Sequence, residues 1–215
     1  GFLTTDCAIT APMLQKALKL AVDDTFNMVS VDGDTSTNDM VSILANGMAQ
    51  NPLIDQEGPD FDAFLTVIQE ICASMAKKIA GDGEGATKLV ECSVHHAPNT
   101  TLAKAIAKSI ITSSLVKTAI FGADANWGRI LCAIGYTEGD FAIDAISVSI
   151  SSAKGEIVVC ENGAGVPFDE ALAKEILLQE EIHMDVDLKQ GEGEATAWGC
   201  DLTYDYVKIN GDYRT

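Results

Sequence analysis

Residues 60–80 constrain the fold more than any other part of the chain. Their apolar side chains recur at three- and four-residue spacing, and they are Phe61, Phe64, Leu65, Ile68, Ile71, Cys72, Met75 and Ile79. This spacing predicts a long helix with one apolar face, which is stable only when it packs against other elements. Gly81 follows and is typical of the residue that ends a helix. The chain is therefore expected to build at least one helix-covered core.

Shorter patterns of both kinds surround this helix. Further helices are expected at residues 11–26, 37–48, 99–112, 127–136 and after Pro167. Strands are expected at residues 2–6, 28–31, 89–94, 116–121, 143–150, 156–160, 181–188 and within 195–209. Helices dominate the first half and strands the second, which indicates a mixed α/β (α+β) fold with a boundary that we place between residues 1–98 and 99–215.

The charge balance excludes some classes of partner. The 215 residues carry 32 acidic and 14 basic side chains, a formal net charge of −18. Such a chain repels nucleic acids and anionic membrane surfaces, so neither is expected as a partner. The chain has no apolar run as long as a membrane span, and its six scattered cysteines have no metal-binding spacing. No signal peptide is expected. We expect a cytoplasmic protein whose cysteines are buried and reduced.

The segment GDGEGATK at residues 81–88 resembles a phosphate-binding loop only superficially. Lys88 follows a threonine, a helix precedes the loop and a strand follows it, so the order of a Walker loop is reversed. Asp82 and Glu84 would also repel a phosphate. Two explanations stay open: a solvated turn that needs glycine, or a loop on which Glu84 accepts hydrogen bonds from a substrate ammonium.

The segment DGDTSTND at residues 32–39 has the alternating oxygen-bearing side chains of a calcium loop. The sixth position is Thr37 and not glycine, and the twelfth is Ile43 and not glutamate. Turns built by Asp, Ser and Thr side chains explain the segment equally well, so no metal site is expected.

Three other features do not identify a functional site when each is taken alone. The histidines His95, His96 and His183 form no recognisable catalytic order and are expected at strand ends on the surface. The segment GADANWGR at residues 122–129 either binds a partner or a carboxylate, or caps a helix that begins near Trp127. The final residues NGDYRT are expected either to fray or to dock into a site.

Together these stretches resemble one family, the ornithine acetyltransferases of arginine biosynthesis, also called glutamate N-acetyltransferases. The matching stretches span the whole chain and are GFLTTD, VDGDTSTND, GDGEGATK, GADANWGRI and NGDYRT. The resemblance implies a layered fold with helices outside sheets, shared with related self-processing aminopeptidases. It also implies a precursor that cuts itself before a threonine, so that this chain is the downstream β chain of an α2β2 heterotetramer with the upstream α chain.

The resemblance also implies a mechanism and its residues. The threonine nucleophile is expected three positions before Gly1, so this chain holds no catalytic residue of its own. Glu84, Asn210 and Thr215 match the substrate contacts of the family, and the α chain is expected to supply the oxyanion hole. The acetyl group would pass from N-acetylornithine through the threonine to glutamate and release ornithine. No cofactor is expected, although some members also use acetyl-CoA as a donor.

Two other functions stay open at this point. A self-processing aminopeptidase would use the same nucleophile to hydrolyse peptides. A small acidic domain that binds calcium or a metabolite through residues 32–39 would have no enzymatic activity.

Overall fold

The computed structural model describes residues 1–213. It divides the chain into two compact units, the first made of residues 1–27 and 35–76 and the second of residues 28–34 with the chain from residue 77 onward. The predicted boundary after residue 98 does not coincide with this division, because residues 77–98 belong to the same unit as the segment that follows them. The resemblance also implies that residues 1–98 form the nucleophile-bearing half of a catalytic domain completed by the α chain, and that residues 99–215 form a C-terminal domain with the substrate-contacting tail; these two roles stay predictions.

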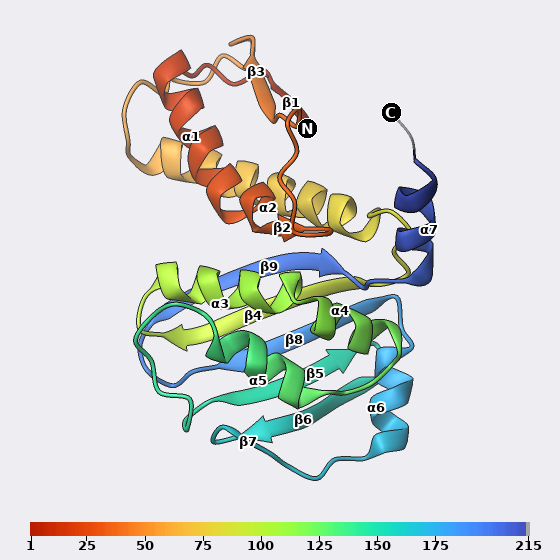
Figure 1. Ribbon diagram of the computed structural model, residues 1–215. Coiled ribbons are helices and arrows are strands. Elements are labelled where there is room, and N and C mark those ends of the chain that lie inside the picture. The colour runs from red at the N-terminus through yellow and green to blue at the C-terminus, as the bar shows by residue number, and fades with distance from the viewer. Residues whose placement is uncertain (214–215) are drawn as a thin grey trace. The chain divides into compact units, whose positions relative to one another are not determined.

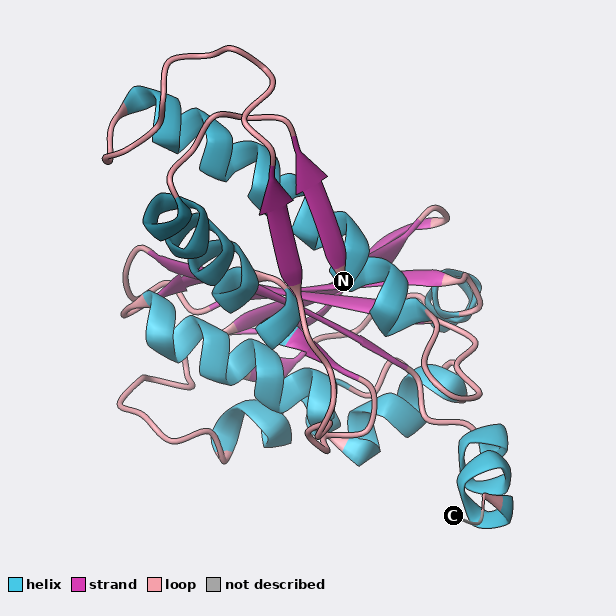
Figure 2. Ribbon diagram, turned by 90° about the horizontal axis from the view of Figure 1, so that it is seen from above, coloured by secondary structure: helices cyan, strands magenta, loops and turns pink. Residues whose placement is uncertain are grey.

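The first unit packs two helices against a two-stranded parallel sheet. Figure 2 shows β1 and β3 side by side and pointing the same way, with Phe2 opposite Ser42 and Thr5 opposite Ala45. One core cluster joins Leu3 of β1 to Ala21, Ile68 and Cys72 of the helices. Its elements are β1 (Phe2–Thr5), α1 (Ala11–Asp24), β3 (Ser42–Ala45) and most of α2 (Pro59–Gly81). The helix predicted from residues 60–80 is confirmed.

The helix predicted at residues 37–48 is wrong, since this segment forms β3. The strand is held by partners far away in sequence: it pairs with β1, and the Ser42 amide donates to the Gly1 carbonyl at 2.9 Å. A four-residue strand with one distant neighbour leaves too short a pattern for periodicity to identify.

The second unit is built on a seven-stranded mixed sheet in the order β2-β9-β4-β8-β5-β6-β7 (Figure 1). Its strands are β2 (Val29–Ser30), β4 (Leu89–Ala97), β5 (Ser147–Ser152), β6 (Gly155–Glu161), β7 (Ala164–Gly165), β8 (Glu181–Asp187) and β9 (Gly193–Cys200). The central strand β4 runs parallel to β8 and antiparallel to β9. The predicted hairpin is confirmed as the antiparallel pair β5–β6.

Helices cover one face of this sheet (Figure 1). They are α3 (Thr100–Thr112), α4 (Ser114–Phe121) and α5 (Trp127–Gly135), while α6 (Glu170–Leu177) packs on β5 and β6. Asn99 caps α3 by accepting a hydrogen bond from the Leu102 amide at 2.9 Å. The side chains expected to point inward, Leu102, Ile106 and Ile110, are all buried.

Two further predictions of secondary structure are wrong. Residues 116–121 form the helix α4 and not a strand, because Ser113 caps the segment and Val116, Ala119 and Ile120 are buried at helical spacing. The strand expected in residues 195–209 stops at Cys200, and α7 (Tyr204–Asp212) follows, capped by Thr203. In both places a local cap decides the structure of a short apolar run.

The mixed α/β fold with helices layered on a sheet is confirmed. A 3-10 turn at Phe26–Met28 completes the secondary structure of the described residues. No helix among these residues combines the length and the apolarity that a membrane span needs.

Candidate functional site

The loop of residues 82–88, called here the Glu84 loop, connects the end of α2 to the start of β4. The Asp82 amide still donates to the Lys78 carbonyl of the helix at 3.1 Å, and a turn follows in which the Ala86 amide donates to the Gly83 carbonyl at 2.9 Å. Gly85 has a φ of +67°, a backbone conformation that side chains other than glycine disfavour. The loop is thus a structured turn at a helix C-terminus, which does not suit phosphate.

Asp201 anchors the far end of this loop. Its buried carboxylate accepts hydrogen bonds from the Thr87 amide at 2.8 Å, the Thr87 hydroxyl at 2.5 Å and the Lys88 amide at 3.0 Å. Hydrogen bonds to a charged acceptor are stronger than neutral ones, and removing the acceptor leaves the donors buried without a partner. Asp201 therefore fixes the point at which the loop enters β4.

Two buried lysines surround this anchor. The Lys88 ammonium donates to the Ile120 carbonyl at 2.5 Å, at the C-terminal end of α4, where a positive charge is favoured. Burial lowers the pKa of Lys88, and the negative charge of Asp201 partly opposes this shift. The Lys117 ammonium donates to the Cys200 carbonyl at 2.5 Å. Helix α4 is thus tied to the segment that carries Asp201.

Thr203 joins the Glu84 loop to α7. Its hydroxyl donates to the Gly85 carbonyl at 2.7 Å and accepts from the Tyr206 amide at 3.3 Å, in the first turn of the helix. The approach is close at Gly85, where an added Cβ would lie 2.7 Å from the Tyr206 nitrogen. A single buried hydroxyl therefore spans the two segments that carry Glu84 and Asn210.

Tyr206 extends the connection to Asp32, in the segment of residues 28–34 of the same unit. Its hydroxyl donates to the Asp32 carboxylate at 2.9 Å. Burial, the hydrogen bond to Asp32 and the nearby charges of Asp32, Glu84 and Asp34 raise the pKa of Tyr206 to about 12. Three carboxylates therefore create a negative field at this edge of the unit, which favours a cation such as an ammonium.

The structure places two of the three predicted substrate contacts, and their surroundings differ. Glu84 is exposed, and no hydrogen bond or ion pair within residues 1–213 engages its carboxylate, so it is free to meet a ligand. Asn210 is exposed on α7, where its side-chain amide donates to the Tyr206 carbonyl at 3.1 Å. It lies in a helix and not in a frayed tail or a turn. Thr215 lies outside the described residues.

Asp201, Thr203 and Tyr206 are part of the site but were not predicted from the sequence. A signal existed for Thr203, because threonine followed by an acid two residues later is typical of a helix N-terminus. No local pattern identifies Asp201 or Tyr206, since their partners lie more than a hundred residues away in the chain.

Residues 32–39 form turns of the kind that the sequence suggested. The Asp34 amide donates to the Asp32 carboxylate at 2.9 Å, and the Asn38 amide donates to the Ser36 hydroxyl at 3.2 Å. Within the described part of the chain, no group of three or more His, Cys, Asp or Glu side chains has the geometry of a metal site.

The segment GADANWGR caps a helix. The Asn126 side chain accepts from the Arg129 amide at 3.2 Å, and the Arg129 guanidinium donates to the Leu115 carbonyl at 2.8 Å. The segment therefore acts as the helix cap that was one of its two interpretations, and the Arg129 guanidinium is hydrogen-bonded within the fold.

The histidines lie on strands beside carboxylates. His95 and His96 are near the end of β4, and His96 contacts Asp187 at 2.9 Å. His183 lies in the middle of β8, beside Glu91 at 3.3 Å, and not at a strand end. None of the three faces a nucleophilic side chain in a hydrogen bond among the described residues.

The cysteines are all free thiols. Cys72, Cys92, Cys160 and Cys200 are buried, and burial raises the pKa of each thiol. A raised pKa keeps a thiol protonated and unreactive. The expectation of six buried cysteines is wrong for two of them, because Cys7 is half-buried and Cys132 is exposed on α5.

Comparison with known proteins gives a consistent match. The family model described as "ArgJ family" covers residues 1–215. The arginine biosynthesis bifunctional proteins ArgJ of Caldanaerobacter subterraneus subsp. tengcongensis and Thermotoga neapolitana are 53% and 51% identical over 215 residues. All of this chain is covered but only 53% and 54% of those proteins, so the chain spans about half the length of the curated relatives it matches.

A solved structure agrees with the fold. The crystal structure of the arginine biosynthesis bifunctional protein argJ from Bacillus halodurans superposes with a TM-score of 0.92 at 47% sequence identity, covering 99% of this chain and 98% of the matched chain.

Proposed function

The chain belongs to the ArgJ family, and on this premise we propose that it is the β chain of an enzyme that moves an acetyl group from N-acetylornithine to glutamate in arginine biosynthesis. The observation that carries the proposal is the family match over all of residues 1–215. The exposed Glu84 carboxylate in a negative field supports it, because the substrate N-acetylornithine carries a positively charged side-chain ammonium.

The proposed chemistry proceeds in two transfers. The hydroxyl oxygen of the threonine expected three positions before Gly1 attacks the acetyl carbonyl carbon, and the α-amine of the same threonine takes the hydroxyl proton. The amide C–N bond breaks, and ornithine leaves with that proton on its amine. The amine of glutamate then attacks the acetyl-threonine ester, the C–O bond breaks, and a proton returns to the threonine oxygen.

The role proposed for this chain is to hold the amino-acid part of the substrate. Glu84 would accept hydrogen bonds from an ammonium, and Asn210 and Thr215 would orient polar groups of the substrate. The glycines of the Glu84 loop let its backbone come close to neighbouring groups without side-chain overlap. The oxyanion hole would come from the α chain and would stabilise the tetrahedral intermediate of both transfers.

The proposal includes the partners and the setting of the enzyme. An α chain cut from the same precursor would complete the site in an α2β2 heterotetramer. No cofactor is required for the exchange, and acetyl-CoA is proposed as a second donor for the glutamate reaction. A biosynthetic enzyme of this kind belongs in the cytoplasm.

The test uses the complete protein produced from its precursor. It is mixed with N-acetylornithine and isotopically labelled glutamate, without acetyl-CoA, and labelled N-acetylglutamate is measured by mass spectrometry. The proposal expects this product and an acetyl group on the N-terminal threonine of the β chain. Formation of free acetate alone would contradict a transferase.

Two other outcomes would point to the alternatives. Cleavage of short peptides without acetyl transfer would identify a self-processing aminopeptidase. A rise in thermal stability on adding calcium, reversed by a chelator, would favour the acidic binding domain. The turns at residues 32–39 and the absence of a metal-binding cluster among residues 1–213 weigh against the latter.

A further inference from the structure

Thr203 uses both hydrogen-bonding capacities of its hydroxyl on different segments of the chain. A hydroxyl has one proton to donate and two lone pairs to accept with. Here the proton goes to the Gly85 carbonyl at 2.7 Å, and a lone pair receives the Tyr206 amide at 3.3 Å. No other side chain within residues 1–213 is hydrogen-bonded to both the Glu84 loop and α7.

Apart from the Thr203 hydrogen bonds, few contacts hold helix α7 in place. None of its residues is buried, and the apolar side chains Tyr204 and Val207 are 83% and 66% exposed. Burial of apolar surface therefore contributes little to its placement. The attachments that the structure does show lie in the first turn: the Thr203 cap, the Tyr206 hydroxyl on Asp32, and an edge-on ring contact between Tyr204 and Phe121.

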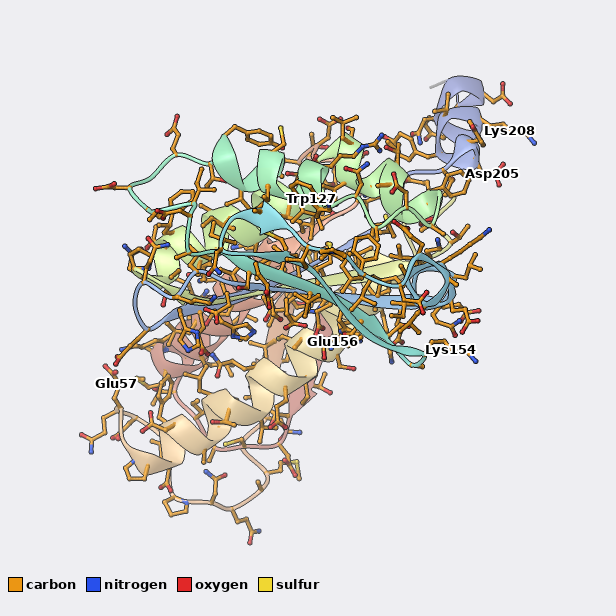
Figure 3. All side chains as sticks on the ribbon, turned by 90° about the horizontal axis from the view of Figure 1, so that it is seen from below. Glu57, Trp127, Lys154, Glu156, Asp205 and Lys208 are labelled. Carbon is orange, nitrogen blue, oxygen red and sulfur yellow. The ribbon has the colours of Figure 1, made fainter. Side chains whose placement is uncertain are left out.

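The direction of the rest of α7 depends on these contacts in its first turn. Figure 3 shows Asp205 and Lys208 pointing outward from this helix. Asn210 lies six residues after Tyr204, which is roughly 9 Å along a helix axis. A tilt of about 10° at the first turn would therefore move Asn210 by roughly 1.5 Å. Misplacement on that scale matters for a group that orients a substrate.

We infer that Thr203 is a positioning residue, which holds the Glu84 loop and α7 in one arrangement so that Glu84 and Asn210 meet the substrate together. The inference rests on the proposed function for its consequence in catalysis, and on the two hydrogen bonds for its structural content. Asp201 anchors the other end of the same loop through Thr87 and Lys88, so losing the Thr203 hydroxyl releases the Gly85 side and leaves the entry to β4 in place.

The test replaces Thr203 in the complete two-chain enzyme. Thr203→Val keeps the shape and removes the hydroxyl, and we expect KM for N-acetylornithine to rise about tenfold with kcat changed much less. Thr203→Ser keeps the hydroxyl and is expected to restore KM to within about threefold of wild type. A purely structural role would instead lower the active fraction, and with it kcat, at unchanged KM.

A matched control removes a hydroxyl elsewhere. The Thr112 hydroxyl donates to the Lys108 carbonyl of its own helix at 2.7 Å, so Thr112→Val should leave KM unchanged. A Thr203→Val enzyme with wild-type KM would overturn the inference. So would equal losses in the Val and Ser variants, because the hydroxyl would then not be the group that acts.

A second measurement needs no variant and no activity. Hydrogen–deuterium exchange of the wild-type enzyme is followed in peptides that cover residues 82–88 and 204–212. The Ala86 amide belongs to the same peptide group as the Gly85 carbonyl, so a shared hydroxyl predicts that the Tyr206 and Ala86 amides become exposed in the same opening event and exchange at similar rates. The Thr87 and Lys88 amides stay protected by Asp201 in that event. Rates that differ more than about a hundredfold would contradict the coupling even if acetyl transfer is demonstrated. Absence of acetyl transfer in the wild type would overturn the proposed function and leave this structural result standing.

Discussion

The closest backbone approach in the candidate site offers a quantitative test. Gly85→Ala adds one methyl group at a residue with a φ of +67°. The added carbon would lie 2.7 Å from the Tyr206 nitrogen and 2.9 Å from the Asp205 carbonyl carbon, both of them backbone atoms that cannot swing away. We expect this change to separate the Glu84 loop from the first turn of α7.

Two unfavourable contributions to the free energy of folding add in Gly85→Ala, and a control variant separates them. The left-handed conformation costs an alanine about 1–2 kcal/mol, partly offset by about 0.4–1 kcal/mol from the less flexible unfolded chain. The steric overlap adds about 1–3 kcal/mol. Gly47 has a φ of +72°, and an added carbon there would lie 4.0 Å from the Ala8 Cα, an ordinary van der Waals contact, so Gly47→Ala has the conformational cost alone. The difference between the variants is therefore about 1–3 kcal/mol.

Hydrogen–deuterium exchange of the complete protein measures this difference where it arises. At about 1.4 kcal/mol for each factor of ten, amides of residues 204–212 should exchange roughly 5 to 150 times faster in Gly85→Ala than in Gly47→Ala. Peptides of the distant hairpin β5–β6 serve as the internal reference. Equal protection of α7 in both variants would show that the loop and the helix are not in the contact that the structure describes, and the reasoning would fail.

Three further outcomes are expected. Glu84→Gln should lower kcat/KM for N-acetylornithine by about tenfold to a thousandfold with unchanged thermal stability, because a charged hydrogen bond to the substrate is lost. The control Glu156→Gln, on the exposed hairpin, should leave turnover unchanged (Figure 3). Wild-type turnover in Glu84→Gln would refute the substrate contact. Ser30→Ala removes a buried hydroxyl that has no hydrogen-bond partner within residues 1–213. The urea midpoint of unfolding should therefore stay equal or rise by the equivalent of about 1 kcal/mol. A fall in the midpoint would show that the Ser30 hydroxyl does have a hydrogen-bond partner. Burial works to raise the pKa of Glu91, but the hydrogen bonds from Lys77 and Trp198 and nearby positive charges lower it below its ordinary value of 4.5. The stability that Glu91 contributes is therefore present above about pH 4.5 and is lost as pH falls through the folded pKa, so the acid slope of the melting temperature should flatten in Glu91→Gln.

Capping and periodicity explain which elements were predictable. The helix of residues 60–80 has about six turns of consistent apolar spacing, and the helix that begins at Thr100 has both an Asn99 cap and an apolar stripe. Patterns of that length leave few alternatives. The short apolar run at residues 116–121 satisfies helix and strand equally well, so only its burial beside α3 and α5 and the Ser113 cap decided it.

The candidate site divides in the same way. Glu84 could be selected from the sequence because acidic residues between glycines are unsuited to a phosphate loop and the surrounding stretch resembles a family pattern. Asp201 could not, and neither could the hydrogen bond of Thr203 to Gly85, because a carboxylate or hydroxyl acquires such a role only when distant segments of the chain fold against it. Those partners lie 113 to 118 residues away, at Lys88, Thr87 and Gly85.

The sequence by itself thus determined the elements whose information is local: long amphipathic helices, the β5–β6 hairpin, the mixed α/β class and the family. The tertiary structure alone decided that residues 42–45 form a strand, that Asp201 anchors the Glu84 loop, and that Thr203 joins Gly85 to Tyr206. The physical reason is that strand pairing and buried hydrogen bonds are interactions between distant segments, whose free energy depends on both partners and on the exclusion of water around them.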